Sequence, residues 1–185
     1  MQPRTLIEIL SVAERLKDTT RHCYTSGGRH ESVAEHCWRA ALMAWFLQDE
    51  FPEADMNKVI YMLLIHDLGE AFTGDIPAFE KNAAHEQEEA ERLTQWVHSL
   101  PEPYASEMTA LYAEMEARQT LEAKIYKALD GMEAVIQHNE SDLSTWIPEE
   151  YELNRTYAQD KVGFSPYLTT LRQIISDDTR KKLGE

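Results

Sequence analysis

Basic residues, cysteines and long apolar runs are all scarce in this sequence of 185 residues. Its 18 lysines and arginines face 33 aspartates and glutamates, a formal net charge of −15. A general nucleic-acid-binding surface is therefore not expected, because binding to a phosphate backbone needs clustered cations. Cys23 and Cys37 form no C-x-x-C pair and predict reduced thiols in a cytoplasmic protein. Residues 1–10 contain no block of signal-peptide length, and the longest apolar run, Val59 to Ile65, is too short to span a membrane.

Several local motifs of enzyme chemistry are also absent. The sequence contains no G-x-G-x-x-G, no P-loop, no H-E-x-x-H and no G-x-S-x-G. None of its seven histidines has a glutamate three residues before it, as a di-iron bundle of the ferritin type requires. These absences remove the usual sequence support for dinucleotide binding, Walker-type phosphate binding, zincin proteolysis and α/β-hydrolase chemistry.

Helical spacing of apolar residues, in contrast, extends along nearly the whole sequence, with clear stripes at residues 6–16 and 121–136. Ser32 and Glu35 have the form of a capping box, which predicts a helix from there to about Phe51. Further helices are expected at about 55–67, 83–99, 103–117, 120–139 and 166–176, with no convincing strand and with Arg21 to His30 as an extended loop. We therefore predict an all-α fold in one domain, residues 1–185, with its core at about 21–140 and C-terminal helices at about 148–183 packed on it.

A cluster of ionisable residues follows the apolar run that ends at Ile65. It contains His66, Asp67 and Glu70, and Asp75 comes shortly after. On a helix, Glu70 is an i,i+4 neighbour of His66 and an i,i+3 neighbour of Asp67, so three side chains can converge. Because burial of ionisable groups without partners costs free energy, a bound cation is the simplest compensation.

Two distant residues extend this cluster. His36 lies toward the apolar side of its own helix, where an imidazole needs a partner. Asp130 interrupts an apolar helix and is followed by Gly131, whose cost within a helix indicates a close approach of other backbone there. Two imidazoles and two carboxylates would give a mixed site suited to manganese, cobalt, zinc or iron, and less typical of calcium.

Each of these residues alone also has a purely structural explanation. His36 could be a hydrogen-bonded core histidine, Asp130 an acid on a helix surface, Glu70 a solvated residue at a helix end and Asp75 a residue that stabilises a turn. Only jointly do they favour a metal site with positions left open for water and substrate. Cys37 lies about 100° round the helix from His36, so we expect a buried thiol and not a co-ligand.

The sequence resembles the HD-domain metal-dependent phosphohydrolases and, within them, the 5'-deoxynucleotidase subgroup. The resemblance rests on Arg21, on Arg29 to His36, on His66 to Glu70 with Thr73-Gly74-Asp75, and on Lys127 to Asp130. The order and spacing of these segments are similar to those of the family throughout. The resemblance implies an all-helical fold and a homodimer.

The resemblance also implies roles for individual residues. The ligands of one divalent metal ion (Mn, Co, Zn, Fe or Mg) would be His36, His66, Asp67 and Asp130. Glu70 would act on the nucleophilic water, and Asp75 would be a second active-site acid. The candidate substrate contacts are Arg21, His22 and Arg29. His22 stands where bacterial members of the subgroup carry a tryptophan that disfavours ribose, so the choice between ribose and deoxyribose stays open.

The expected function is hydrolysis of (deoxy)nucleoside 5'-monophosphates to nucleoside and phosphate. One alternative is a phosphohydrolase of the same fold that acts on a nucleoside triphosphate or another phosphate ester. Another is a non-catalytic metal- or nucleotide-binding module, against which Glu70 and Asp75 weigh, because structural metal sites are usually closed and need no spare acids. The expected partners are a small nucleotide substrate and a second copy of the chain, with no nucleic-acid polymer and no membrane.

Overall fold

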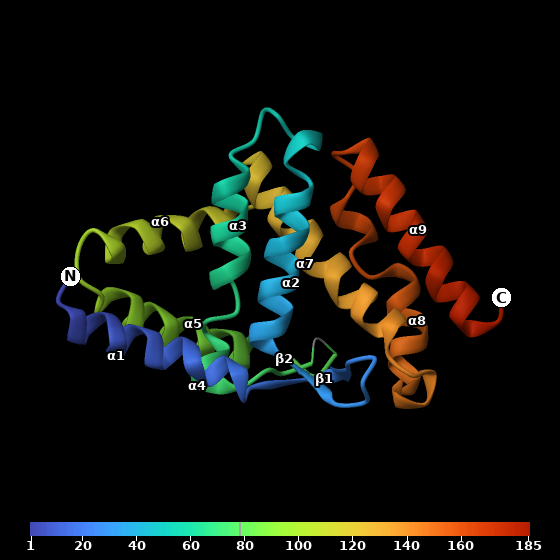
Figure 1. Ribbon diagram of the computed structural model, residues 1–185, viewed down its shortest axis with the longest axis horizontal. Coiled ribbons are helices and arrows are strands. Elements are labelled where there is room, and N and C mark those ends of the chain that lie inside the picture. Colours follow the sequence, from blue (N-terminus) through green and yellow to red (C-terminus); the bar gives the residue numbers. More distant parts are fainter. Residues whose placement is uncertain (78) are drawn as a thin grey trace.

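The structure is a computed structural model that describes residues 1–77 and 79–185 (Figure 1). The longer helices are α1 (Pro3–Glu14), α2 (Val33–Phe46), α3 (Met56–Ile65), α5 (Ala83–His98), α6 (Tyr104–Ala117), α7 (Leu121–Glu140), α8 (Pro148–Thr156) and α9 (Pro166–Leu183). Shorter helical turns are η1 (Arg15–Lys17), η2 (Gln48–Glu50), α4 (Glu70–Thr73), η3 (Leu143–Thr145) and η4 (Gln159–Lys161). The predicted all-α fold is confirmed. Over the two described ranges, no helix is both long enough and apolar enough to cross a membrane.

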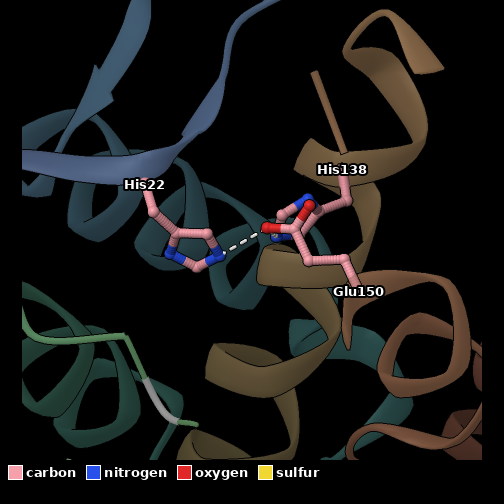
Figure 2. Close-up of side chains that lie close together, drawn as sticks. All are labelled: His22, His138 and Glu150. Carbon is pink, nitrogen blue, oxygen red and sulfur yellow. Dashed lines mark ion pairs between the residues drawn. The ribbon is translucent and has the colours of Figure 1, made fainter. Parts of the chain in front are cut away.

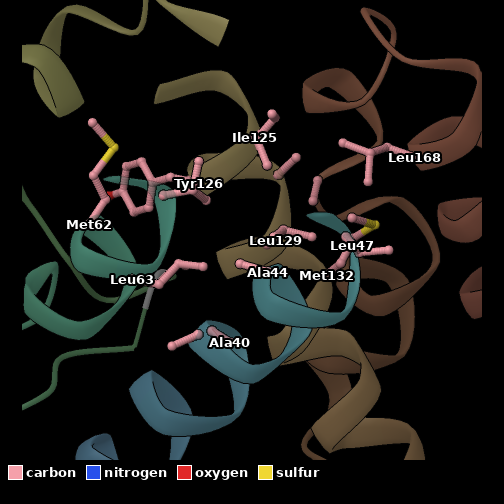
Figure 3. Packing of buried hydrophobic residues seen from close by; sticks show 14 of the residues in the cluster. Ala40, Ala44, Leu47, Met62, Leu63, Ile125, Tyr126, Leu129, Met132 and Leu168 are labelled. Carbon is pink, nitrogen blue, oxygen red and sulfur yellow. The ribbon is translucent and has the colours of Figure 1, made fainter. Parts of the chain in front are cut away.

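Helices α2, α3 and α7 pack on one another at the centre of the molecule (Figure 1). Their shared interface buries large apolar side chains, among them Met62, Leu63, Leu129 and Met132 (Figure 3). Each such side chain contributes about 1.5–3 kcal/mol when it is fully buried. Helix α9 packs on α7 and adds Leu168 to the same core. This packing fixes the relative positions of the three helices from which the predicted metal ligands come.

Local sequence signals determine where these helices begin. The backbone N–H of Glu35 donates to Ser32 Oγ (3.3 Å), and the backbone N–H of Ser32 donates to Glu35 Oε2 (2.9 Å), which is the predicted capping box. Asp55 caps α3 and Thr120 caps α7 in the same manner, through their side-chain oxygens. His36 consequently lies in the first turn of α2, in the buried interior.

Some helix ends differ from the prediction. Helix α2 ends at Phe46, before the expected Phe51, because Leu47 leaves helical geometry and the η2 turn follows. Helix α9 continues to Leu183, well beyond residue 176, and ends at Gly184 in the left-handed conformation that glycine adopts at many helix C-termini.

The segment between α1 and α2 is not the extended loop that the sequence predicted. Strands β1 (Thr20–Tyr24) and β2 (His30–Ser32) form a short antiparallel hairpin with an irregular register. The backbone N–H of Thr25 donates to the carbonyl of Arg29 (2.7 Å), and Gly28 adopts a φ of 81°, which glycine allows without strain. Strand β1 contacts α7, so the hairpin carries residues 21 and 22 to the side of that helix.

A close approach at Gly131, as the sequence indicated, is present. A Cβ atom at this position would lie 2.7 Å from the Cβ of Ala158, which precedes η4. Glycine in α7 therefore lets the segment between α8 and α9 pack directly on the helix that carries Asp130.

Candidate metal centre

Four side chains from three parts of the fold bring nitrogen and oxygen atoms to one point. His36 Nε2 on α2 lies 3.2 Å from His66 Nε2 and 3.2 Å from Asp130 Oδ1 on α7. Asp67 Oδ2, which follows α3, lies 3.1 Å from His66 Nε2 and 3.8 Å from His36 Nε2. Atoms that bind one ion at about 2.1 Å stand roughly 3.0–3.5 Å apart. The spacing of His36, His66 and Asp67 is that of a group that could hold one metal ion, and Asp130 Oδ1 lies within 3.4 Å of both histidine Nε2 atoms.

The two histidines are oriented so that their Nε2 atoms face this point. His36 Nδ1 hydrogen-bonds to Glu133 Oε2, and His66 Nδ1 donates to the carbonyl of Leu63 at 2.8 Å. Because a carboxylate and a carbonyl only accept hydrogen bonds, each Nδ1 carries a proton, and Nε2 is the ring atom of each histidine that could bind a metal ion. This is the protonation pattern that ligation through Nε2 requires.

Glu133 is a site residue that the sequence reasoning missed. It is fully buried and accepts a hydrogen bond from Arg39 Nε at 2.6 Å. Burial alone would raise the pKa of Glu133, but His36, Arg21 and Arg39 outweigh burial and hold that pKa below its ordinary value. The available signal was its position on α7, three residues after Asp130 and thus on the same face.

Lys127 is a second missed residue, although it belongs to a segment that carried the family resemblance. Its Nζ lies 2.6 Å from Asp130 Oδ2. Burial would raise the pKa of Asp130, but Lys127, His36 and His66 lower it well below its ordinary value. Asp130 is therefore ionised, with Oδ2 bound to Lys127 and Oδ1 turned toward the histidines.

Glu70, which is buried, and Asp75, which is half-buried, lie close to the ligand cluster. Glu70 begins α4, and burial together with the charges of Asp67 and Asp75 raises its pKa to about 10. Its Oε2 atom is buried without a hydrogen-bond partner. Burial also raises the pKa of Asp75. Two acids held in this state beside ionised ligands indicate a site that a cation and a substrate complete.

The three predicted substrate contacts occupy different surroundings. Arg21 borders the cluster, with Nη1 3.6 Å from Glu133 Oε2. His22 lies beside α8, with Nε2 2.8 Å from Glu150 Oε1. Arg29 is exposed and forms a two-pronged ion pair with Glu35. The structure thus brings Arg21 to the cluster and leaves Arg29 on the surface of the hairpin.

A cavity of about 800 Å³ opens beside the ligand cluster, between α5, α6 and α7. His66 and Asp67 form part of its wall, together with Lys81 and Lys127. A volume in this range is typical of pockets that enclose a small organic ligand. Both lysines form ion pairs there, Lys81 with Glu89 at 2.8 Å and Lys127 with Asp130 at 2.6 Å.

Residues 13–171 match the protein family described as HD domain, and the chain belongs to that family. It is 34% identical over 142 residues to 5'-deoxynucleotidase HDDC2 of Homo sapiens, a match that covers 74% of this chain and 68% of the human protein. It is 29% identical over 176 residues to 5'-deoxynucleotidase HDDC2 of Dictyostelium discoideum, over 90% of this chain and 87% of that protein.

Solved structures show the same fold. The predicted metal-dependent phosphohydrolase of Magnetospirillum magnetotacticum MS-1 superposes with a TM-score of 0.81 and 27% identity, over 97% of this chain and 93% of that one. A conserved hypothetical protein of Pyrococcus furiosus gives a TM-score of 0.71 and 30% identity, over 94% and 99%. These matches confirm the resemblance that the motifs predicted. With the cluster of histidines and acids, they assign a divalent metal cofactor to this chain.

Proposed function

We propose that this protein is a metal-dependent 5'-nucleotidase that hydrolyses (deoxy)nucleoside 5'-monophosphates to nucleoside and phosphate. The observation that carries the proposal is the convergence of the four ligand atoms beside the unpartnered carboxyl oxygen of Glu70. The relatives named 5'-deoxynucleotidase support the choice of substrate class.

The proposed metal ligands are His36, His66, Asp67 and Asp130. When bound, a divalent ion supplies Lewis-acid stabilisation of a phosphoryl oxygen and lowers the pKa of water toward neutrality. Two imidazole nitrogens in the ligand set favour manganese, cobalt, zinc or iron over magnesium, which prefers oxygen ligands and retains several waters.

The remaining site residues have separate tasks in this proposal. Glu70 orients the attacking water through its free Oε2 and takes up its proton, since a cation nearby favours the ionised carboxylate. Asp75 orients the leaving oxygen, and its raised pKa suits it to hold a proton there. Arg21 forms charge-assisted hydrogen bonds to the phosphate. Lys81 and Lys127, which line the cavity, offset the rest of the phosphate charge.

Contacts of His22 and Arg29 with the substrate stay predictions. For His22, the support is that it lies near Asp75. Arg29 would have to leave its ion pair with Glu35 to reach a phosphate.

We also propose that the protein is a homodimer. Helices α2 and α3 pack against each other and expose large aromatic side chains: Trp38 is 62% exposed, Trp45 55% and Tyr61 58%. An exposed apolar face of this kind is typical of a protein interface.

That residues 1–185 form one HD domain likewise stays our prediction. Cys23 and Cys37 are buried free thiols, which supports a cytoplasmic location.

The test is phosphate release from a panel of deoxynucleoside and ribonucleoside 5'-monophosphates, with protein that is first stripped of metal and then reloaded. Asp67→Ala should lose the metal ion of this site and the activity. Glu70→Gln should keep the metal and lose about 10²–10⁴-fold in kcat, because it removes a proton acceptor and little else. Glu88→Gln, which alters an exposed acid on α5, is the matched control and should behave as the wild type.

Equal phosphate release with and without metal would contradict the proposal. Release of tripolyphosphate from a nucleoside triphosphate, with no action on monophosphates, would identify the alternative phosphohydrolase. Nucleotide binding without turnover of any substrate would identify the non-catalytic module.

A further inference from the structure

A second group of potential metal ligands lies outside the centre described above. His22 on β1, His138 on α7 and Glu150 on α8 point toward one another (Figure 2). Glu150 Oε1 lies 2.8 Å from His22 Nε2 and 3.8 Å from His138 Nε2. One ligand atom from each residue lies within 4.8 Å of the others. Three elements that are far apart in the sequence thus supply two imidazoles and one carboxylate to a common point.

The two carboxylate oxygens of Glu150 are used differently. Oε2 accepts a hydrogen bond from the backbone N–H of Ile147 at 2.9 Å and so caps the first turn of α8. This contact fixes the side chain and leaves Oε1 toward the two histidines. Glu150 is almost completely buried, so a charge at Oε1 needs a cationic partner.

The two histidines are held in place by their surroundings. The ring of His138 packs edge-on against Trp146, whose Nε1 donates to the backbone carbonyl of His138 at 3.0 Å. These contacts hold the ring with its Nε2 toward Glu150 Oε1.

His22 lacks the hydrogen bonds that would account for its position. Its Nδ1 is buried without a partner, and the contact of Nε2 with Glu150 Oε1 is short but lacks hydrogen-bond geometry. The ring also contacts Phe79, with 5.5 Å between the ring centroids. A ring nitrogen and a buried carboxylate oxygen held this close share either a proton or a metal ion.

We propose that His22, His138 and Glu150 form a second binding site for a divalent metal ion of the zinc class. Two imidazole nitrogens and one carboxylate oxygen are a donor set that zinc and cobalt accept, and three protein ligands leave a coordination position open. His22 acts in this site as a metal ligand, so any effect of this residue on the substrate would be exerted through the ion. The site is independent of the proposed hydrolysis.

The test is the metal content of the full chain after removal of metal with a chelator and dialysis against excess Zn²⁺, measured by elemental analysis. The wild type should hold two ions per chain. Asp67→Ala and Glu150→Gln should hold one each, and the double variant should hold close to none. Glu150→Gln keeps an oxygen that can cap α8, because glutamine serves in the same position of a capping box. His98→Gln, which removes an exposed histidine on α5, is the matched control and should still hold two.

Substitution of Co²⁺ for Zn²⁺ gives an independent measurement. The wild type should show two sets of visible absorption bands, and His22→Gln and Glu150→Gln should each lose the same set. If Glu150→Gln fails to fold, His22→Gln still tests the site. One ion per chain in the wild type, or two ions in both His22→Gln and Glu150→Gln, would overturn the proposal. Metal content is measured without substrate. The second site can therefore be confirmed or rejected whether or not the protein hydrolyses nucleotides.

Discussion

His36 and Glu133 are 97 positions apart in the sequence and share a buried hydrogen bond between Nδ1 and Oε2. Glu133 is in turn held by Arg39. The bond fixes the ring of His36 on the side opposite the proposed metal and leaves Nε2 free to bind it. The orientation of one proposed ligand therefore depends on a carboxylate that never touches the ion.

Replacement of Glu133 should weaken the first metal site without removing any of its ligands. In Glu133→Gln, the neutral amide binds the Nδ1 proton of His36 less strongly, so metal affinity should fall by about 10–100-fold. Competition with a chromophoric chelator measures this. Glu140→Gln alters an exposed carboxylate that also binds Arg39, and its affinity should match the wild type. Equal affinities in all three proteins would show that Glu133 has no part in orienting His36.

Metal should stabilise the folded chain, because the four ligand atoms converge only in the folded state. At a free metal concentration 100 times Kd, the gain in unfolding free energy is about 2.7 kcal/mol. For a chain of this length, that corresponds to a rise in Tm of roughly 5–10 °C. Calorimetry with and without chelator measures the rise, which should be much smaller in Asp67→Ala than in the wild type when both are compared in the Glu150→Gln background, where the proposed second site is removed. A rise of equal size in that variant would place the stabilising ion elsewhere.

Gly131→Ala should destabilise the protein although alanine favours helix. The added Cβ would meet the Cβ of Ala158 at 2.7 Å, and overpacking of this kind costs about 1–3 kcal/mol. The gain in helix propensity, about 1 kcal/mol, offsets only part of that cost. Denaturant unfolding measures the difference.

Ala158→Gly provides the complementary change, since Ala158 has a φ of 62°, which glycine adopts readily. Combined with Gly131→Ala, it should restore most of the lost stability. Gly163→Ala is the control, because a Cβ at that position meets no heavy atom within 4 Å. If the double variant is no more stable than Gly131→Ala, the contact with Ala158 is not the cause.

His138 should make the metal-free protein less stable in mild acid. Its pKa is about 4 in the folded state, lowered mainly by burial, and about 6.5 when unfolded, so folding favours the neutral ring. The contribution of His138 to the free energy of unfolding is complete above pH 6.5. It is lost as the pH falls toward 4, and the loss is at most about 3 kcal/mol. Glu150 opposes this shift, and the charge of Arg21 adds to it.

Denaturant unfolding between pH 4 and pH 7, in the presence of chelator, measures the effect of His138. The unfolding free energy of His138→Gln should fall less steeply than that of the wild type over this range. Parallel curves for the two proteins would mean that the ring of His138 is not held neutral by the fold.

Much of the helical framework could be predicted from the sequence because its signals are local. The capping pair Ser32 and Glu35 and the apolar stripe at 121–136 each act within a few residues of the helix they define. The hairpin of β1 and β2 could not be predicted, because strands of five and three residues with an irregular register carry too little alternation to recognise.

The residues of the candidate site likewise include some that the sequence could predict and others that it could not. His66, Asp67 and Glu70 could be grouped from sequence because they lie within about one helical turn of each other. The roles of Glu133 and Glu150 could not, since each depends on a partner about 100 or more positions away. Contacts of that range depend on the packing of α2, β1 and α9 against α7 and of α8 against α9, and a local sequence pattern does not predict them.

Asp130, Glu133 and His138 all belong to one continuous helix, α7. At about 1.5 Å per residue, Asp130 and His138 stand roughly 12 Å apart along its axis. An insertion or deletion of one residue between them would turn His138 by about 100° relative to Asp130 and carry it away from Glu150. Both groups of ligands together therefore fix the number of residues between Asp130 and His138. Insertions and deletions are to be expected in the connections at either end of α7 and not within it.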